Sequence, residues 1–514
     1  MRHLFVCCDG TWATPEKETD GVLTPTNVVR FYNSIAETSS LGVTQLKYYH
    51  PGVGTDGTVI DKVVGGGMGV GLGKNIMSAY RWLSDHYQQG DLLFLIGFSR
   101  GAYTVRCLSG MISKCGLLKP HAGRPESETW DAIAATYKRG YRDGRPQDGW
   151  KQSGWRYHEP EDLEIRFLGV WDTVGARGVP DHLGVADLLD GTEKYRFADS
   201  NLASRVSFAR HAVAIDELRA SFFPTLWKED AGDTRVEQQW FPGGHSDVGG
   251  GWPQTGLSDG ALKWMMKGAN KAANSSGDSR DDLFEGWAHE QIKPNHLDQI
   301  HNKLTGVWAK LPAHPRGVPN FQEDSGRFHK SALARRQSPP IFQAPYWKTH
   351  ALPPGGRVTI PIYARDPWNA TGVWVEPNVE YKFTAEGEWV DKSITCGPDG
   401  CRDGDFQAGE VFHLFGSLIG AAEGVFRRVT NNDKADFIAS KREEDMPWFT
   451  LVGAIANSTT GDHDGTPDSH ETFRIGSSNS YPVTRGGYLY CYANDAWGFY
   501  ENNRGQISLT IERP

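Results

Sequence analysis

The chain has 514 residues, of which 38% are hydrophobic and 11% aromatic, enough to build large cores, so a disordered chain is excluded. Its formal net charge is −9, and Lys and Arg are scattered rather than clustered, which excludes a general nucleic-acid binder. No run of about 18 apolar residues is present, and the run from Leu4 to Cys8 is too short for a signal-peptide core. We therefore expect a globular protein that is made in the cytoplasm without a signal peptide, does not span a membrane and has no nucleic-acid partner.

The seven cysteines do not indicate a disulfide framework, because their number is odd and Cys7 and Cys8 lie inside a predicted strand. Cys396 and Cys401 are close enough in sequence to close a small loop. No two cysteines have the C-x2-C spacing of a zinc site. The pattern therefore predicts neither a disulfide-rich fold nor a zinc protein.

The first predicted strand, His3 to Cys8, ends at a turn with the sequence Asp9-Gly10-Thr11-Trp12. A loop at the carboxyl end of a strand is where α/β enzymes place functional groups. A helix over Asn27 to Ala36 and a strand over Gln45 to His50 are predicted next.

A glycine-rich stretch, Val64 to Lys74, precedes a predicted amphipathic helix over Ile76 to Tyr87. It lacks the P-loop pattern, because Met68 stands where glycine is needed and Asn75 where Ser or Thr is needed. We interpret it as a flexible loop beside the site rather than as a nucleotide cradle.

The stretch around Ser99 is the most informative in the chain. An apolar run, Leu92 to Ile96, leads into Gly97-Phe98-Ser99-Arg100-Gly101, and a predicted helix over Ala102 to Leu118 follows. Strand, sharp turn and helix form the setting of a nucleophile elbow, in which flanking glycines leave room for a strained serine. Ser99 is therefore the candidate nucleophile, and the alternative is a serine in an ordinary glycine-flanked turn.

Two further candidates follow predicted strands. Asp172 comes after a buried strand over Leu163 to Trp171, with the N-cap of a following helix as its alternative role. His245 stands in a glycine-rich loop after a strand over Arg235 to Phe241, and between the two strands a helix over Ser200 to Glu217 is predicted. The order Ser99, Asp172, His245 is the order that α/β-hydrolases use.

The chemistry assigns a role to each group. A serine hydroxyl needs a base, here His245, and the imidazole needs an orienting carboxylate, here Asp172, with Asp247 as the alternative acid.

Oxyanion donors are expected at the Arg100 N–H and at Gly10 or Thr11, with Asp9 bracing that loop. The Arg100 side chain either pairs with an anionic substrate group or binds a structural carboxylate.

The chain divides into three predicted parts. Residues 1–275, which end with a helix over Leu257 to Asn274, form an α/β domain with a mostly parallel, doubly wound sheet. Residues 276–345 form a partly helical cover and linker. Residues 346–514 contain short alternating runs separated by turn residues, which predicts an all-β sandwich.

Five sequence blocks in residues 1–275 resemble the α/β-hydrolase family that includes the phospholipase effectors of bacterial type VI secretion: CDGTW (8–12), GFSRGAYTVR (97–106), FLGVWDTVGA (167–176), WFPGGHSDVGGGW (240–252) and LSDGALKWM (257–265). The resemblance implies cleavage of phospholipid or related acyl esters without a catalytic cofactor. It also implies export by a secretion machinery in the absence of a signal peptide, and an immunity protein as a partner.

The stretch from Tyr492 to Gly505 resembles the calcium loop of the small bacterial galactose-binding lectins. That resemblance implies Ca²⁺ bound by Asp495, Asn502 and Asn503, with a backbone carbonyl such as that of Phe499, and a sugar bound on the ion. An Asn-rich hairpin turn is the alternative.

Two functions from different classes follow. The first is a serine hydrolase of acyl esters, a lipase or phospholipase, whose C-terminal module targets a glycan, a membrane surface or a partner. The second is a binding protein on a degenerate hydrolase scaffold, which acts through the C-terminal module.

Overall fold

The computed structural model describes residues 1–10, 18–19, 21–52, 70–121, 123–174, 201–228, 233–274, 280–301, 313–401, 441–457, 470–497 and 499–514. Within these ranges, no helix is both long enough and apolar enough to cross a membrane.

The N-terminal half is built on one six-stranded sheet in which every neighbouring pair is parallel. The strand order is β10-β9-β8-β5-β1-β4. The strands are β1 (His3–Cys8), β4 (Gln45–His50), β5 (Leu92–Phe98), β8 (Glu164–Trp171), β9 (Val206–Ala214) and β10 (Val236–Phe241). The α/β class predicted for this half is confirmed.

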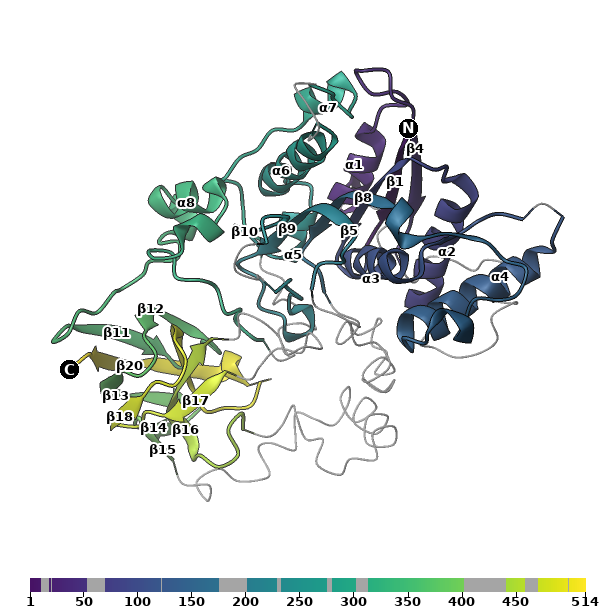
Figure 1. Cartoon of the computed structure of the whole chain (residues 1–514). Helices are drawn as coiled ribbons and strands as arrows, with labels where there is room; N and C mark the ends of the chain where they lie inside the picture. The colour runs from purple at the N-terminus through teal and green to yellow at the C-terminus, as the bar shows by residue number, and fades with distance from the viewer. Residues whose placement is uncertain are drawn as a thin grey trace.

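Helices cover both faces of the sheet (Figure 1), because alternate side chains of the buried strands point to opposite sides. On one face, Leu93 and Leu95 share a core with α2 (Val70–His86) and α3 (Arg100–Cys115). On the other, Phe94 and Ile96 share a core with α1 (Asn27–Ser34) and α6 (Gly256–Ala273).

Shorter elements complete this half and the chain that connects it to the C-terminal part. They are β2 (Glu18–Thr19) paired with β3 (Val22–Leu23), β6 (Leu117–Leu118) paired with β7 (Tyr157–His158), α4 (Glu126–Ala135), α5 (His245–Gly249), α7 (Gly286–Gln291), α8 (Lys330–Gln337), a π-helix over Thr136–Arg142, and 3-10 turns over Gln147–Gly149, Pro160–Asp162, Ala220–Phe222, Ser325–Arg327 and Ile341–Gln343.

Two predicted elements differ from the structure. The helix predicted over Ser200 to Glu217 is wrong, because residues 206–214 form strand β9. This strand is hydrogen-bonded between β8 and β10, and its pairing in the sheet overrides local helix propensity. The loop predicted over Val64 to Lys74 is wrong from Val70 onward, where α2 begins, while residues 64–69 lie outside the described ranges.

The C-terminal part consists of two antiparallel five-stranded sheets. One contains β11 (Arg357–Tyr363), β20 (Asn503–Glu512), β13 (Glu380–Asp391), β14 (Ile394–Cys396) and β18 (Ser478–Pro482). The other contains β12 (Asn369–Val375), β19 (Gly487–Ala493), β16 (Trp448–Ala456), β15 (Asp399–Cys401) and β17 (Glu471–Arg474). Their inward side chains form one hydrophobic cluster, which includes Trp389, Leu451 and Leu509. Cys396 and Cys401 form a disulfide between β14 and β15.

The chain between the two parts packs against both of them. Val318 and Phe321 share a hydrophobic cluster with Trp240 of the parallel sheet and with Tyr488 and Tyr490 of β19. The contact between the two parts is therefore apolar at its centre.

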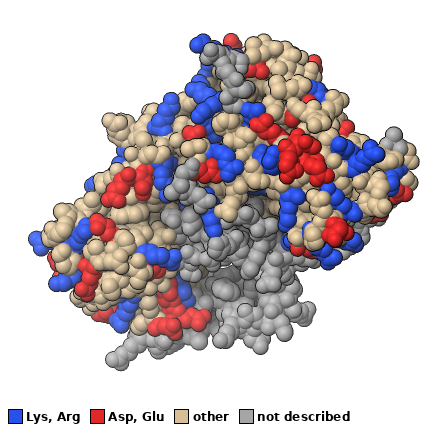
Figure 2. All heavy atoms as spheres, viewed as in Figure 1, with Lys and Arg blue, Asp and Glu red and all other residues tan. Residues whose placement is uncertain are grey.

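On the face shown in Figure 2, blue and red side chains intermingle over the described residues of both parts.

Candidate active site

Ser99 stands at the carboxyl end of β5, directly before α3, in a strained backbone conformation. Its φ is 56° and its ψ is −125°, values that a residue with a Cβ rarely adopts. Its N–H donates to the carbonyl of Trp171 at 3.1 Å, which fixes the turn to the end of the neighbouring strand β8. The structure therefore gives Ser99 the backbone expected of a nucleophile elbow.

The two glycines that flank Ser99 are required by close backbone contacts. A Cβ on Gly97 would lie 2.5 Å from the carbonyl oxygen of Gly101. A Cβ on Gly101 would lie 2.1 Å from the carbonyl oxygen of Cys8, at the end of β1. Both distances are far below van der Waals contact, so only glycine lets α3 start this close to the sheet.

His245 and Asp172 are hydrogen-bonded although 73 residues separate them in sequence. His245, the first residue of α5, lies 2.6 Å through Nδ1 from Oδ2 of Asp172. Asp172 follows β8 with a φ of 37° and is fully buried. Its Oδ1 accepts the N–H of Ala214 at 2.9 Å. Thr173 and Val174, the two described residues directly after Asp172, are not helical, so Asp172 is not the N-cap of a helix that begins there.

The imidazole of His245 is held between aromatic rings at the same sheet edge as Ser99. Its centroid lies 4.5 Å from that of Phe98, the neighbour of Ser99, and 4.9 Å from that of Phe222. Burial lowers the pKa of His245 below its ordinary value, although the hydrogen bond and the charge of Asp172 partly offset this. The ring is therefore neutral near pH 7, as a general base must be.

Arg316 is a site residue that the sequence analysis missed. Its guanidinium donates to both oxygens of Asp172, from Nη1 at 2.6 Å and from Nη2 at 3.0 Å. Burial alone raises the pKa of Asp172, but the charge of Arg316 and the hydrogen bond from His245 outweigh it and hold that pKa far below its ordinary range. A single arginine in the sequence AHPRGVP carries no local signal of this contact.

Asp247 supports the loop that carries His245, through contacts with Gly244 and His301. Its Oδ2 accepts the N–H groups of Gly244, at 2.9 Å, and of His301, at 3.0 Å. Its Oδ1 lies 2.6 Å from Nδ1 of His301, whose ring stacks on Trp252. Asp172, rather than Asp247, is the carboxylate on His245.

The loop after β1 lies against Ser99. A Cβ on Gly10 would lie 3.2 Å from the Cβ of Ser99. The Gly10 N–H donates to Oδ1 of Asp9 at 2.7 Å, while Oδ2 of Asp9 accepts the hydroxyls of Thr26 and Tyr49. Asp9 therefore braces this loop through three donors.

The other two predicted oxyanion residues are Thr11 and Arg100. Thr11 lies outside the described ranges. Arg100 is the first residue of α3, where backbone N–H groups have no partner within the helix, and its side chain is half-buried.

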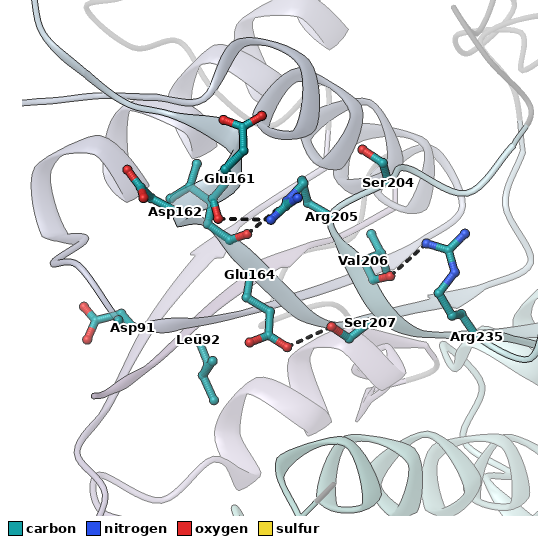
Figure 3. Close-up of a pocket in the computed structure, with 12 residues that line it drawn as sticks. Asp91, Leu92, Glu161, Asp162, Glu164, Ser204, Arg205, Val206, Ser207 and Arg235 are labelled. Atoms are coloured by element: carbon teal, nitrogen blue, oxygen red, sulfur yellow. Dashed lines mark hydrogen bonds between the residues drawn. The ribbon is translucent and has the colours of Figure 1, made fainter. Parts of the chain in front are cut away.

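A surface pocket of about 510 Å³ lies at the opposite edge of the sheet (Figure 3). Its lining includes Leu92 at the start of β5, Glu164 at the start of β8 and Val206 at the start of β9. In Figure 3 the labelled Arg205 and Arg235 already donate to backbone carbonyls in its wall. This pocket is distinct from the Ser99 site, because the strands are parallel and Ser99 follows their carboxyl ends.

A second candidate site lies at the start of β20. Asn503 donates through Nδ2 to Oδ2 of Asp495 at 2.8 Å, and Asn502 donates through Nδ2 to Oδ1 of Asp391 at 2.7 Å. The side-chain oxygens of both asparagines are buried and have no hydrogen-bond partner. Burial, with a contribution from Asp391, raises the pKa of Asp495 to about 7.

These groups fit a hard cation. Two carboxylates and two unpartnered amide oxygens are the ligand types that Ca²⁺ takes. The carbonyl of Phe499 accepts the N–H of Asn502 at 3.3 Å. Among the described residues, no group of three or more His, Cys, Asp or Glu residues could hold a metal ion, so any site here depends on the asparagines.

A parallel sheet with a strained serine and a His–Asp pair at its carboxyl edge defines a class of α/β proteins with a functional site at that edge. The chain belongs to the family of type VI secretion phospholipase effectors with a Tle1-like catalytic domain, whose family model matches residues 2–268.

Several proteins are similar to parts of the chain. Uncharacterized protein YEL023C of Saccharomyces cerevisiae is 27% identical over 243 residues, which cover 43% of this chain and 32% of that protein. The chain thus spans about a third of the length of this curated relative.

Among solved structures, an uncharacterized protein from Pseudomonas aeruginosa has 18% identity and a TM-score of 0.34, over 57% of this chain and 49% of that chain. A Tle1 effector bound to the VgrG spike of a type VI secretion system has 18% identity and a TM-score of 0.30, over 49% of this chain and 51% of that chain. The PllA-like lectin domain of EclA has 14% identity and a TM-score of 0.19, over 30% of this chain and 95% of that chain. Likenesses with TM-scores this low carry no argument about function.

Proposed function

We propose that this protein is a lipase or phospholipase of the α/β-hydrolase class that cleaves acyl esters through Ser99, His245 and Asp172. The observation that carries the proposal is the 2.6 Å contact between His245 Nδ1 and Asp172, at the sheet edge where Ser99 is strained. Membership of the phospholipase effector family supports a lipid substrate.

The first half of the reaction forms an acyl-enzyme. With Nδ1–H donated to Asp172, the other ring nitrogen of His245, Nε2, is free of its proton and takes the one from the Ser99 hydroxyl. Ser99 Oγ then bonds to the ester carbonyl carbon. The imidazolium that results is stabilised by the ionised Asp172 and returns its proton to the leaving alcohol.

The second half releases the fatty acid. Water loses a proton to His245, attacks the acyl carbon, and Ser99 regains its proton as the carboxylic acid leaves. Both tetrahedral intermediates need donors for their oxyanion, which we assign to the Arg100 N–H at the start of α3 and to Gly10 or Thr11. The Gly10 N–H must leave Asp9 before it can serve, since Asp9 accepts it in this structure.

The partners follow from the family. We assign export to a type VI secretion machinery and protection of the producing cell to an immunity protein, on the basis of membership of that effector family. The Arg100 side chain, beside Ser99, remains a candidate for pairing with an anionic headgroup.

The C-terminal module receives a separate proposal. Asp495, Asn502 and Asn503 would hold Ca²⁺, which would supply positive charge to the unpartnered oxygens and a surface for a sugar or another polyol. The two buried amide oxygens without partners favour this over an ordinary hairpin turn.

The decisive experiment measures hydrolysis of a panel of phospholipids and short acyl esters by the wild-type chain and by Ser99→Ala. We expect the wild type to hydrolyse at least one ester class and Ser99→Ala to lose that activity and fluorophosphonate labelling. Equal rates would end the proposal. Glycan binding without labelling of Ser99 would instead support a binding protein on a degenerate scaffold.

A further inference from the structure

Arg316 reaches the centre of the proposed catalytic site from a distant part of the chain. Its side chain is almost fully buried, and its two terminal nitrogens make four hydrogen bonds. Two go to Asp172, and the others go to the carbonyls of Ala214 and Phe222. A planar guanidinium that grips a carboxylate with both nitrogens fixes the orientation of that carboxylate.

The carboxylates of Asp172 and Glu217, both hydrogen-bonded to His245, are each paired with an arginine. Asp172 and Glu217 supply two negative charges, and Arg316 and Arg219 supply two positive ones. Glu217 accepts the backbone N–H of His245 at 3.2 Å and pairs with Arg219 at 2.6 Å. On the remaining side, Asp247 of α5 is engaged by His301. Loss of Arg316 would leave an uncompensated negative charge beside the imidazole.

The segment 313–321, which carries Arg316, is fastened to the parallel-sheet domain on one side. Ala313 forms a β-bridge with Arg219, and the N–H of His314 donates to the carbonyl of Leu218 at 2.6 Å. These contacts join the segment to the same loop that holds Glu217.

The C-terminal module fastens the same segment on both sides of Arg316. Before Arg316, the indole N–H of Trp368 donates to the carbonyl of Ala313 at 3.1 Å. The ring of His470 also stacks on that of His314, with centroids 3.7 Å apart. After Arg316, the N–H of Phe321 donates to the hydroxyl of Tyr488 at 3.2 Å.

We propose that Arg316 is a positioning residue for the Asp172–His245 pair and that the docked C-terminal module holds it there, so the module is a requirement for turnover and not only a targeting element. This inference rests on the proposed hydrolase function. It assigns the module a role in catalysis through three contacts with one short segment.

The first test compares Arg316→Gln and Arg316→Lys with the wild type in kcat/KM across pH. Arg316→Gln should lose about 100-fold, the cost of a small misplacement of a catalytic group. Its acidic limb should move to higher pH, because an unopposed Asp172 carboxylate holds the proton on His245 more strongly. Arg316→Lys keeps the positive charge but cannot bind both oxygens of Asp172 with two nitrogens. Its acidic limb should therefore stay near that of the wild type, and its kcat/KM should lie between those of Arg316→Gln and the wild type.

Two results would overturn the role of Arg316. One is an unchanged rate and pH profile in Arg316→Gln. The other is an equal loss in both variants without a shift of the limb, which indicates damage to the fold alone. Retention of the thermal unfolding transition checks that each variant folds.

The second test concerns the module and uses a matched control. Trp368→Phe removes the hydrogen bond to Ala313 and should lower kcat/KM by about fivefold, the factor for one neutral hydrogen bond. Trp389→Phe removes an indole hydrogen bond to the carbonyl of Phe449 inside the module and should leave kcat/KM unchanged. Equal activities of these two variants would overturn the role of the module.

Failure of the proposed function is a separate outcome. A wild-type chain that hydrolyses no ester and takes no label at Ser99 ends the hydrolase proposal. The positioning role is then decided by the NMR titration of the His245 ring in the full chain. A midpoint at higher pH in Arg316→Gln supports it, and an unchanged midpoint overturns it.

Discussion

At the scale of single residues, His245 is tuned by charges contributed from three separate loops. Asp172 follows β8, Glu217 follows β9, and Arg316 comes from the chain between the two domains. Burial raises the pKa of Glu217, but the hydrogen bond and charge of Arg219 outweigh it and lower that pKa to about 2. Glu217 is therefore ionised throughout the range in which His245 titrates.

The two candidate acids differ in what they touch, which makes their variants distinguishable. Asp172→Asn should lower kcat by about 10⁴-fold, because the amide favours the wrong tautomer of His245. Asp247→Asn should keep most of the activity and lower the free energy of unfolding by about 1–3 kcal/mol, since it weakens contacts with Gly244 and His301. Steady-state kinetics and denaturant unfolding check both, and the reverse ranking of activities would refute the assignment of Asp172.

The pH dependence of kcat/KM should report His245. Its pKa lies below the ordinary value, so activity should persist below pH 6.5 and be lost as His245 gains its proton. The charge of Glu217 raises this pKa, so Glu217→Gln should move the acidic limb to still lower pH.

Glu237→Gln is the control for that shift, because Glu237 pairs with Arg210 on neighbouring strands. It should leave the limb where it is. A limb that moves to higher pH in Glu217→Gln contradicts the electrostatic account.

At the scale of elements, the contact between α3 and the ends of β1 and β5 creates the strained serine. Gly101 rests on the carbonyl of Cys8, and Gly97 faces the first turn of α3. The first turn of the helix therefore abuts the sheet edge, and its N–H groups and positive dipole end lie beside Ser99.

Gly101→Ala tests that contact. The new methyl would lie 2.1 Å from the carbonyl oxygen of Cys8, so α3 must shift. We expect a loss of about 3 kcal/mol or more in the free energy of unfolding and loss of ester hydrolysis.

Gly260→Ala in α6 is the matched control, because an added Cβ there meets nothing within 4 Å. It should be neutral or stabilise by about 1 kcal/mol. Thermal unfolding and initial rates measure both variants, and a fully active Gly101→Ala would argue against the elbow.

At the scale of the whole molecule, the two domains share the apolar cluster around Phe321 and Tyr488 and the polar contacts of Trp347 and Tyr346 with Asp216. Asp216 follows β9 and also accepts the N–H of Gly243, at the entry to the His245 loop. Stability of the C-terminal module is therefore expected to affect the parallel-sheet domain as well.

Calcium provides the test at this scale. If Asp495, Asn502 and Asn503 bind Ca²⁺ only in the folded state, Ca²⁺ at 100 times its Kd should stabilise the chain by about 2.7 kcal/mol relative to chelator. Asp495→Asn should abolish that shift, while Asp399→Asn, on β15 and paired with Arg474, should retain it. The measurement is thermal unfolding with Ca²⁺ or with chelator. No shift in the wild type counts against the site.

The sequence by itself determined the parallel α/β class of the N-terminal half, most strand positions, and the choice of Ser99, Asp172 and His245 as candidates. A buried strand can be recognised from a run of apolar residues, and a nucleophile elbow from the glycines around its serine, because both patterns depend on residues that are neighbours in the sequence. The sequence pattern predicts a helix where β9 lies, since a strand that is hydrogen-bonded on both sides within a parallel sheet lacks the regular alternation of a half-exposed strand. Only the tertiary structure decided that Asp172 rather than Asp247 meets His245, and that Arg316 holds Asp172. Those contacts join residues 73 and 144 positions apart, and a separation of that kind leaves no pattern in the local sequence.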